Sequence, residues 1–116
     1  MELSRQPSQN EAQLLELLIQ KSAIDFPADW DSDLLVKPLS DGGMGSLLLL
    51  PKGVKENCNR MLGQQVSEYQ FADVDGIDVI ASLNVDNQGK LFELDIWKTD
   101  FTPLMSIPPQ LTQANS

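Results

Sequence analysis

Three short segments in the last third of the chain alternate apolar and polar residues, and they restrict the fold more than any other feature. They span residues 65–73, 77–85 and 91–98, and two short polar connections that contain glycine separate them. Alternation puts every second side chain on the same side of a strand. Short connections of this kind join antiparallel neighbours. The sequence therefore predicts a three-stranded antiparallel meander.

The start of the chain predicts one helix. Ser8 and Glu11 have the spacing of a capping box, in which each side chain bonds the backbone N–H of the other residue. A wide apolar stripe follows, so we expect a helix over about residues 9–23. A stripe of this width is typical of a helix that lies on a sheet.

Two more strands are expected between this helix and the meander. Residues 34–39 and 46–50 are short apolar segments, and the sequence DGGMG at 41–45 between them must reverse the chain. A helical turn is possible around residues 56–61. The predicted fold class is α+β, with the N-terminal helix packed on one face of a mainly antiparallel sheet of about five strands that ends in the meander.

Length and composition indicate a single domain over residues 1–116, with an ordered core at about 9–107 and frayed termini. No apolar run approaches the roughly 20 residues that cross a bilayer, and Met1–Pro7 does not resemble a secretory signal. Cys58 is the only cysteine and cannot form an internal disulfide, which suits a reducing compartment. We therefore expect a cytoplasmic protein.

The two connections of the meander set its register. A three-residue loop ending in Gly76 pairs Phe71 with Val79. A four-residue turn ending in Gly89 pairs Leu83 with Phe92. Residues that face the core then meet one another in both hairpins. The expected core set of the last two strands is Ile77, Val79, Ala81, Leu83, Val85, Phe92, Leu94 and Ile96.

The same register gathers acidic side chains on the opposite face. We expect that face to contain Glu68, Gln70, Asp78, Ile80, Ser82, Glu93, Asp95 and Trp97. Across the strands, Ile80 should lie near Asp95, Ser82 near Glu93 and Asp78 near Trp97.

Four carboxylates without a basic residue are unusual on a purely solvated face, because like charges repel. A tryptophan among them is typical of a binding surface. The candidate partner-binding residues are Glu68, Asp78, Ile80, Glu93, Asp95 and Trp97, with Glu93 and Asp95 expected to be exposed. A plain solvated face and a face covered by the chain's own loops are the alternatives.

Charge and composition favour binding over catalysis. The chain has 17 acidic and 8 basic residues, a net charge of -9, and no histidine. Such a protein repels nucleic acid and anionic membranes and attracts basic proteins. Without histidine the commonest general base and most zinc sites are excluded. No catalytic residue, metal site or cofactor is predicted: the aspartates of residues 25–33 lack the glycine and glutamate of an EF-hand, and residues 42–45 do not form a P-loop.

Two motifs resemble a small bacterial family associated with toxin–immunity loci, including those of contact-dependent growth inhibition. They are DGGMGSL at Asp41–Leu47 and SLNVDNQGKLFELDIWKTDFTPL at Ser82–Leu104. With the N-terminal helix, the resemblance spans about residues 10–107. It implies an immunity protein that binds a toxin domain in a tight 1:1 complex and blocks its active site or substrate cleft. No catalytic residues transfer.

Together with the acidity of the chain, the resemblance implies a basic toxin domain, of nuclease type, as the partner. Two other functions are open at this point. The chain could be a non-catalytic adaptor or subunit of another bacterial complex, or a divalent-metal-dependent hydrolase that uses the carboxylates of the sheet.

Overall fold

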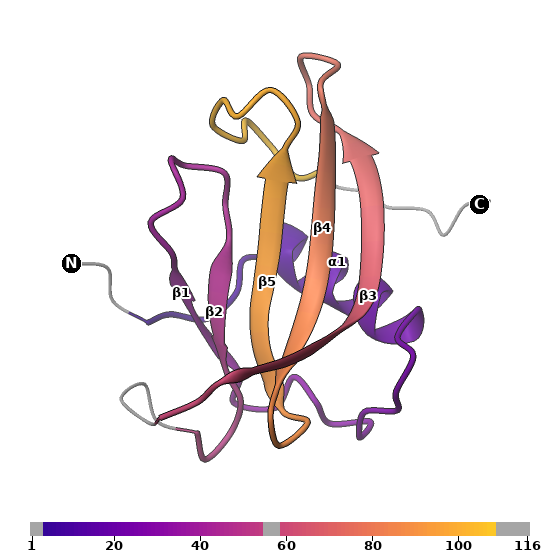
Figure 1. The fold of residues 1–116 in the computed structure, drawn as a ribbon, viewed down its shortest axis with the longest axis vertical. Helices are drawn as coiled ribbons and strands as arrows, with labels where there is room; N and C mark the ends of the chain where they lie inside the picture. Colours follow the sequence, from indigo (N-terminus) through magenta and orange to yellow (C-terminus); the bar gives the residue numbers. More distant parts are fainter. Residues whose placement is uncertain (1–3, 55–58, 109–116) are drawn as a thin grey trace.

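The structure, a computed structural model, describes residues 4–54 and 59–108. Its elements are α1 (Gln9–Gln20), β1 (Leu35–Pro38), β2 (Leu47–Leu50), β3 (Leu62–Ala72), β4 (Asp78–Asp86) and β5 (Leu91–Lys98). The strands form an antiparallel sheet in the order β1-β2-β5-β4-β3, with α1 across one face (Figure 1). The predicted α+β class and C-terminal meander are confirmed. The helical turn expected at residues 56–61 lies partly outside the described residues, and its described part, residues 59–61, is not helical. Cys58 lies outside the described residues.

Helix α1 begins with the expected capping box. The N–H of Glu11 donates to Ser8 Oγ at 3.1 Å, and the N–H of Ser8 donates to Glu11 Oε1 at 2.8 Å. The helix ends at Gln20, three residues before the predicted end, and the N–H of Ala23 donates to the carbonyl of Val66 on β3. The chain therefore leaves helical geometry to join the edge of the sheet.

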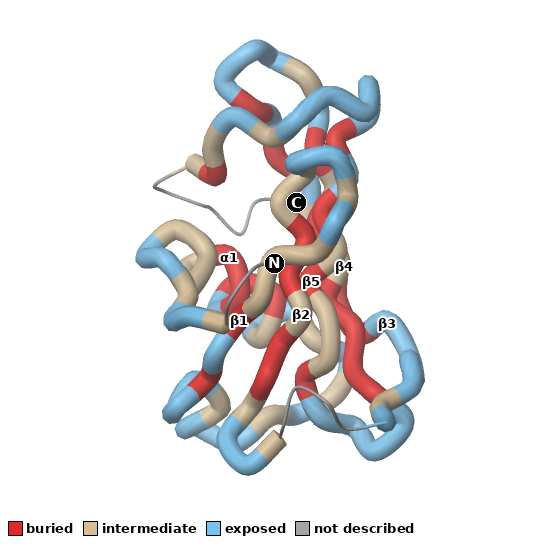
Figure 2. Tube along the Cα trace, turned by 90° about the vertical axis from the view of Figure 1, so that its left-hand side faces the viewer, coloured by how far each residue is buried: buried red, intermediate tan, exposed pale blue. Residues whose placement is uncertain are grey.

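The core lies between α1 and the face of the sheet that it covers, here called the inner face. Figure 2 shows buried positions in the strands and in α1, and exposed positions mainly in the connecting loops. Phe26 and Trp30 pack against this core. Its buried side chains include Leu14, Leu15 and Leu18 of α1 and Val36, Leu49, Val79, Ala81, Leu83, Leu94 and Ile96 of the sheet.

The predicted register of the β3–β4 hairpin is confirmed. Phe71 pairs with Val79, and the N–H of Asp73 donates to the carbonyl of Ile77 at 2.9 Å across a three-residue loop. Gly76 closes this loop with φ +83°, a backbone conformation that favours glycine. The turn therefore sets the pairing of the two strands from Ser67 to Ala72, and the register shifts only beyond that stretch, towards Leu62.

The predicted register of the β4–β5 hairpin is wrong by two residues. Leu83 pairs with Leu94, because the loop is one residue shorter than predicted and a bulge follows between Asn84 and Val85. Leu91, not Phe92, is the buried residue at the start of β5. A shift of two keeps the side chains from Glu93 to Trp97 on their predicted faces, but the bulge takes Phe92 out of the predicted core set and puts Leu91 in its place.

The carboxylate of Asp86 explains the shorter loop. It accepts hydrogen bonds from the N–H groups of Gln88 (2.8 Å) and Lys90 (2.9 Å), while the Asp86 N–H donates to the Lys90 carbonyl. Burial raises the pKa of Asp86, but these backbone bonds and the Arg60 guanidinium outweigh burial and lower it. Asp86 is thus the closing residue of the hairpin.

The DGGMG sequence reverses the chain between β1 and β2, as expected. Gly42, Gly43 and Gly45 have φ of +75°, +84° and +96°. The carboxylate of Asp41 accepts the N–H groups of Met44 (3.0 Å) and Ser46 (2.9 Å). The carbonyl of Gly43 accepts the N–H of Leu104 at 3.0 Å, so this loop packs on the segment after β5.

A buried ion pair holds the end of the sheet where β5 finishes. Lys98 Nζ lies 2.9 Å from Asp73 Oδ2 and 2.7 Å from Asp75 Oδ2, and it also donates to the carbonyl of Pro103 at 3.3 Å. The side chains of Lys98 and Asp73 are 1% and 0% exposed. The hydrogen bonds to Asp73 and Asp75 raise the pKa of Lys98, although burial opposes them. The lysine therefore stays charged.

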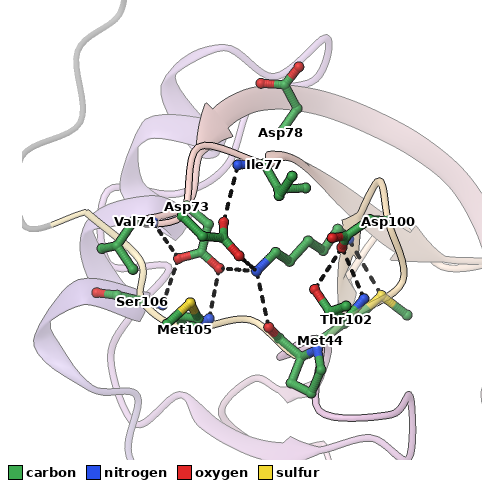
Figure 3. Close-up of polar contacts among 12 residues, drawn as sticks. Met44, Asp73, Val74, Ile77, Asp78, Asp100, Thr102, Met105 and Ser106 are labelled. Atoms are coloured by element: carbon green, nitrogen blue, oxygen red, sulfur yellow. Dashed lines mark hydrogen bonds and ion pairs between the residues drawn. The ribbon is translucent and has the colours of Figure 1, made fainter.

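Asp73 also binds the backbone of two loops, and so connects them to the ion pair. Its carboxylate accepts the N–H groups of Met105 (2.8 Å), Ser106 (3.1 Å) and Val74 (2.7 Å), as Figure 3 shows. Burial alone would raise the pKa of Asp73, but the bond from Lys98 and these backbone bonds lower it from 3.8 to about 2.

We expect Asp73→Asn to destabilise the protein at neutral pH, because the buried ammonium of Lys98 loses one of its two carboxylates. A carboxyl whose folded pKa is depressed contributes stability that is present above 3.8 and lost as pH falls through about 2. The variant should therefore lose less stability than the wild type between pH 4 and pH 2, measured by urea denaturation. Asp78→Asn is the matched control, since Asp78 is exposed and its carboxylate points away from this cluster (Figure 3). Equal acid sensitivity of Asp73→Asn and wild type would contradict this role.

Gly45→Ala and Gly42→Ala separate packing from backbone strain in the DGGMG loop. Both positions have positive φ, which costs an alanine on the order of 1–2 kcal/mol. A Cβ on Gly45 would also lie 3.0 Å from Leu104 Cδ2, whereas a Cβ on Gly42 meets nothing within 4 Å. We expect Gly45→Ala to lower the free energy of unfolding more than Gly42→Ala does. Equal losses in chemical denaturation would show that the contact with Leu104 contributes nothing.

Candidate functional site

The predicted acidic set lies together on the face of the sheet away from α1, here called the outer face. It comprises Glu68, Gln70, Asp78, Ile80, Ser82, Glu93, Asp95 and Trp97, as expected. Glu68, Gln70, Asp78 and Trp97 are exposed, and the other four are half-buried. Their cross-strand neighbours differ from the predicted ones, because the β4–β5 register is shifted.

Two rows of side chains cross the outer face from β5 to β3. One row runs from Asp95 through Ser82 to Glu68. The other runs from Trp97 through Ile80 to Gln70. We call the row of Asp95, Ser82 and Glu68 the acidic row, and the row of Trp97, Ile80 and Gln70 the apolar row. The two rows are neighbours, and Ile80 lies beside Trp97 rather than beside Asp95.

An exposed aromatic pair stands at the β5 end of the apolar row. The rings of Trp97 and Phe101 are 5.9 Å apart between centroids and tilted by 46°. Trp97 is 44% exposed and Phe101 is 69% exposed. Phe101 has φ +64°, which is unfavourable for a residue with a side chain, and its N–H donates to the Lys98 carbonyl at 2.8 Å. The turn after β5 therefore keeps the Phe101 ring exposed to solvent at the cost of an unfavourable backbone conformation.

Glu93 and Asp95 form a close pair of carboxylates beside this row. Burial, the charge of Asp95 and a side-chain hydrogen bond with Asp95 raise the pKa of Glu93, while the charge of Arg60 opposes the shift. Asp95 Oδ2 also accepts the amide of Asn84 at 2.7 Å. Both carboxylates are half-buried, so the expectation that they are simply exposed is wrong. A cation that approaches from solvent would reduce the repulsion between these two carboxylates.

Arg60 lies at the end of the outer face that the chain itself covers. Its guanidinium donates to Asp86 at 3.0 Å, to the Leu49 carbonyl at 2.7 Å and to the Leu91 carbonyl, and lies 4.8 Å from the centre of the Phe92 ring. The start of β3 crosses the sheet there, on the side away from α1 (Figure 1). Asn84 is 6% exposed although it belongs to the outer side. The chain thus covers one end of this face and leaves the part around Ile80 and Trp97 open.

Two buried ion pairs, Lys98 with Asp73 and Arg60 with Asp86, remove cations and carboxylates from the surface in equal number, so the excess of acidic residues stays on the rest of the chain. Lys98 and Arg60 are two of the eight basic residues, and their side chains are 1% and 8% exposed. Both cations are directed at carboxylates and carbonyls within the fold. Glu68, Asp78 and Asp100 remain exposed around the aromatic pair and the outer face. The electrostatic complement of such a surface is a basic one.

Three residues of this region were missed by sequence reasoning. Phe101 follows the last strand, where no alternation assigns its direction. Arg60 comes from an irregular segment just before β3, and the register shifts in the first part of β3 bring it to Asp86. Asn84 alternates with the core set, so its face was readable, but its burial was not.

The chain belongs to a family described as a domain of unknown function, DUF6984, whose model matches residues 4–108. Searches of curated proteins and of solved structures return no significant match. No helix in the described part of the chain is long and apolar enough to cross a membrane. Within residues 4–54 and 59–108, no three acidic or thiol side chains gather closely enough to hold a metal ion.

Asp95→Asn should lower the pKa of Glu93 towards 4.5, because it removes the neighbouring charge and keeps an oxygen that accepts the Asn84 amide. A carboxyl with a raised folded pKa favours the folded state at low pH, and this stability is lost as pH rises from 4.5 through the raised pKa. At pH 7 the variant should therefore be more stable than the wild type, by about 0.5 kcal/mol. Carboxyl NMR titration and denaturation would check both effects. An unchanged Glu93 titration would show that the two carboxylates do not interact.

Proposed function

We propose that this protein is an immunity protein that neutralises a basic toxin domain by forming a 1:1 complex through its outer face. The observation that carries the proposal is the exposed pair of Trp97 and Phe101, continued by Ile80 and bordered by carboxylates. Exposed aromatic rings beside an acidic row are suited to a partner with a basic, partly apolar surface.

The two kinds of side chain have different parts in this mechanism. The net charge of -9 and the exposed carboxylates attract a basic domain and speed its encounter. The aromatic rings and Ile80 lose water on contact and supply the holding energy. Glu93 and Asp95 then pair with Lys or Arg side chains of the toxin. A nuclease-type toxin presents such side chains in its substrate cleft, so the complex would block that cleft.

The motif resemblance supports this function, and the two motifs contact each other in the fold. The loop of Asp41–Leu47 contacts the end of the second motif through the bond from Leu104 to Gly43. Trp97 and Phe101 belong to that second motif. The resemblance therefore covers the aromatic pair and the loops beside it, while the link to toxin–immunity loci comes from the resemblance alone.

A charge-reversal experiment tests the outer face. We expect Glu68→Lys with Asp78→Lys to weaken binding of the toxic domain encoded by the neighbouring gene by about 100-fold or more, measured by isothermal titration calorimetry. Both side chains are exposed, so the fold should persist. The same change at Glu93 and Asp95 would break the bond from Asn84 and is less informative.

Glu16→Lys with Asp25→Lys is the control for this experiment. It changes the net charge by the same amount at two exposed positions outside the outer face. Equal weakening by both double variants would mean that only total charge matters, which would refute the outer face as the interface. No complex between the wild-type protein and the neighbouring domain would refute the immunity function.

A further inference from the structure

Strand β3 forms one edge of the sheet. It is the last strand in the order β1-β2-β5-β4-β3 and is 11 residues long. The N–H of Asp73 faces β4, so by antiparallel alternation residues 67, 69 and 71 also face β4. Glu68, Gln70 and Ala72 therefore point their N–H and C=O groups outward. Within the described part of the chain, no group bonds to them.

The opposite edge of the sheet is protected. Arg5 and Val36 exchange both backbone hydrogen bonds, at 2.8 Å and 2.7 Å, and β1 ends in Pro38. On β3, the corresponding protection stops at Val66, whose carbonyl accepts the N–H of Ala23. Beyond the bulge at Val66 the strand pairs regularly with β4 up to Ala72. An edge without proline, lysine or bulge is a template for another strand.

The side chains along this edge define what a docked strand would contain. The acidic row of the outer face, from Asp95 through Ser82, ends at Glu68 on β3. A residue added beside Glu68 would extend that row, and a Lys or Arg there would lie next to its carboxylate. Alternate residues of the same strand would face inward beside Tyr69 and Phe71 and would be apolar.

We propose that the basic partner adds an extended segment, with basic and apolar residues in alternation, to the free edge of β3 from residue 67 to 72. This rests on the proposed function for the nature of the partner. Main-chain bonds to Glu68, Gln70 and Ala72 supply affinity and direction, and the alternating side chains supply selectivity. The acidic charge of the chain disfavours a second copy of itself at this edge.

Two synthetic peptides of equal composition test the inference on the full chain. One alternates Lys and Val over seven residues, and the other has the four Lys together followed by the three Val. We expect the alternating peptide to slow amide hydrogen exchange at Glu68, Gln70 and Ala72 by about tenfold or more, followed by NMR, and the block peptide to leave it unchanged.

Gln70→Pro with Gln70→Ala as its matched control separates backbone from side chain. Proline removes only an outward N–H and keeps the bonds to β4, which edge strands tolerate. We expect Gln70→Pro to weaken the alternating peptide by about tenfold or more, and Gln70→Ala to bind within about twofold of wild type. The exchange measurement on the wild type remains decisive if the proline variant does not fold.

The other results overturn the inference, and they separate it from the proposed function. One such result is that both peptides bind Gln70→Pro equally well and that neither binds the double variant Glu68→Lys with Asp78→Lys. The outer face would then bind cations without a docked strand. Exchange at the three amides that is already slow in the free protein would show that this chain covers its own edge. No binding of the alternating peptide at millimolar concentration would also refute the docked strand, while the toxin titration would still judge the proposed function.

Discussion

A lysine ammonium buried away from water holds one end of the sheet together. Lys98 can remain charged there because Asp73, Asp75 and the Pro103 carbonyl surround it. Through Asp73, the same cluster fixes the backbone of the β3–β4 turn and of the segment after β5. The position of the turn that carries Phe101, and so the shape of the exposed aromatic pair, depends on this charge cluster.

Much of the fold could be predicted because alternation and turn chemistry are local. The pairing of Phe71 with Val79 followed from one glycine, and the assignment of residues to two faces survived a register error of two. Lys98 continues the inward positions of Leu94 and Ile96, so its direction was readable from the sequence. Its partners were not, because they lie 23 to 25 residues away along the chain.

The candidate site shows where local reasoning ends. The short loop of the β4–β5 hairpin depends on the Asp86 hydrogen bonds, which no periodic pattern indicates. Arg60 reaches the sheet only because β3 bends across it. The acidic row was predicted, but its buried end and its aromatic border come from contacts between distant segments. The open part of the outer face is consequently smaller and more apolar than the sequence indicated.

The order of the strands also governs how the protein can fold. Strands β3, β4 and β5 follow one another through short turns, whereas β2 must join β5 across the 40 residues from 51 to 90, a separation that slows pairing. We expect the meander to form the folding nucleus and the β1–β2 hairpin to dock last. Until it docks, β5 presents an open apolar edge that could pair with another chain. The hydroxyl of Ser46, which bonds both backbone groups of Ile96, then closes that edge.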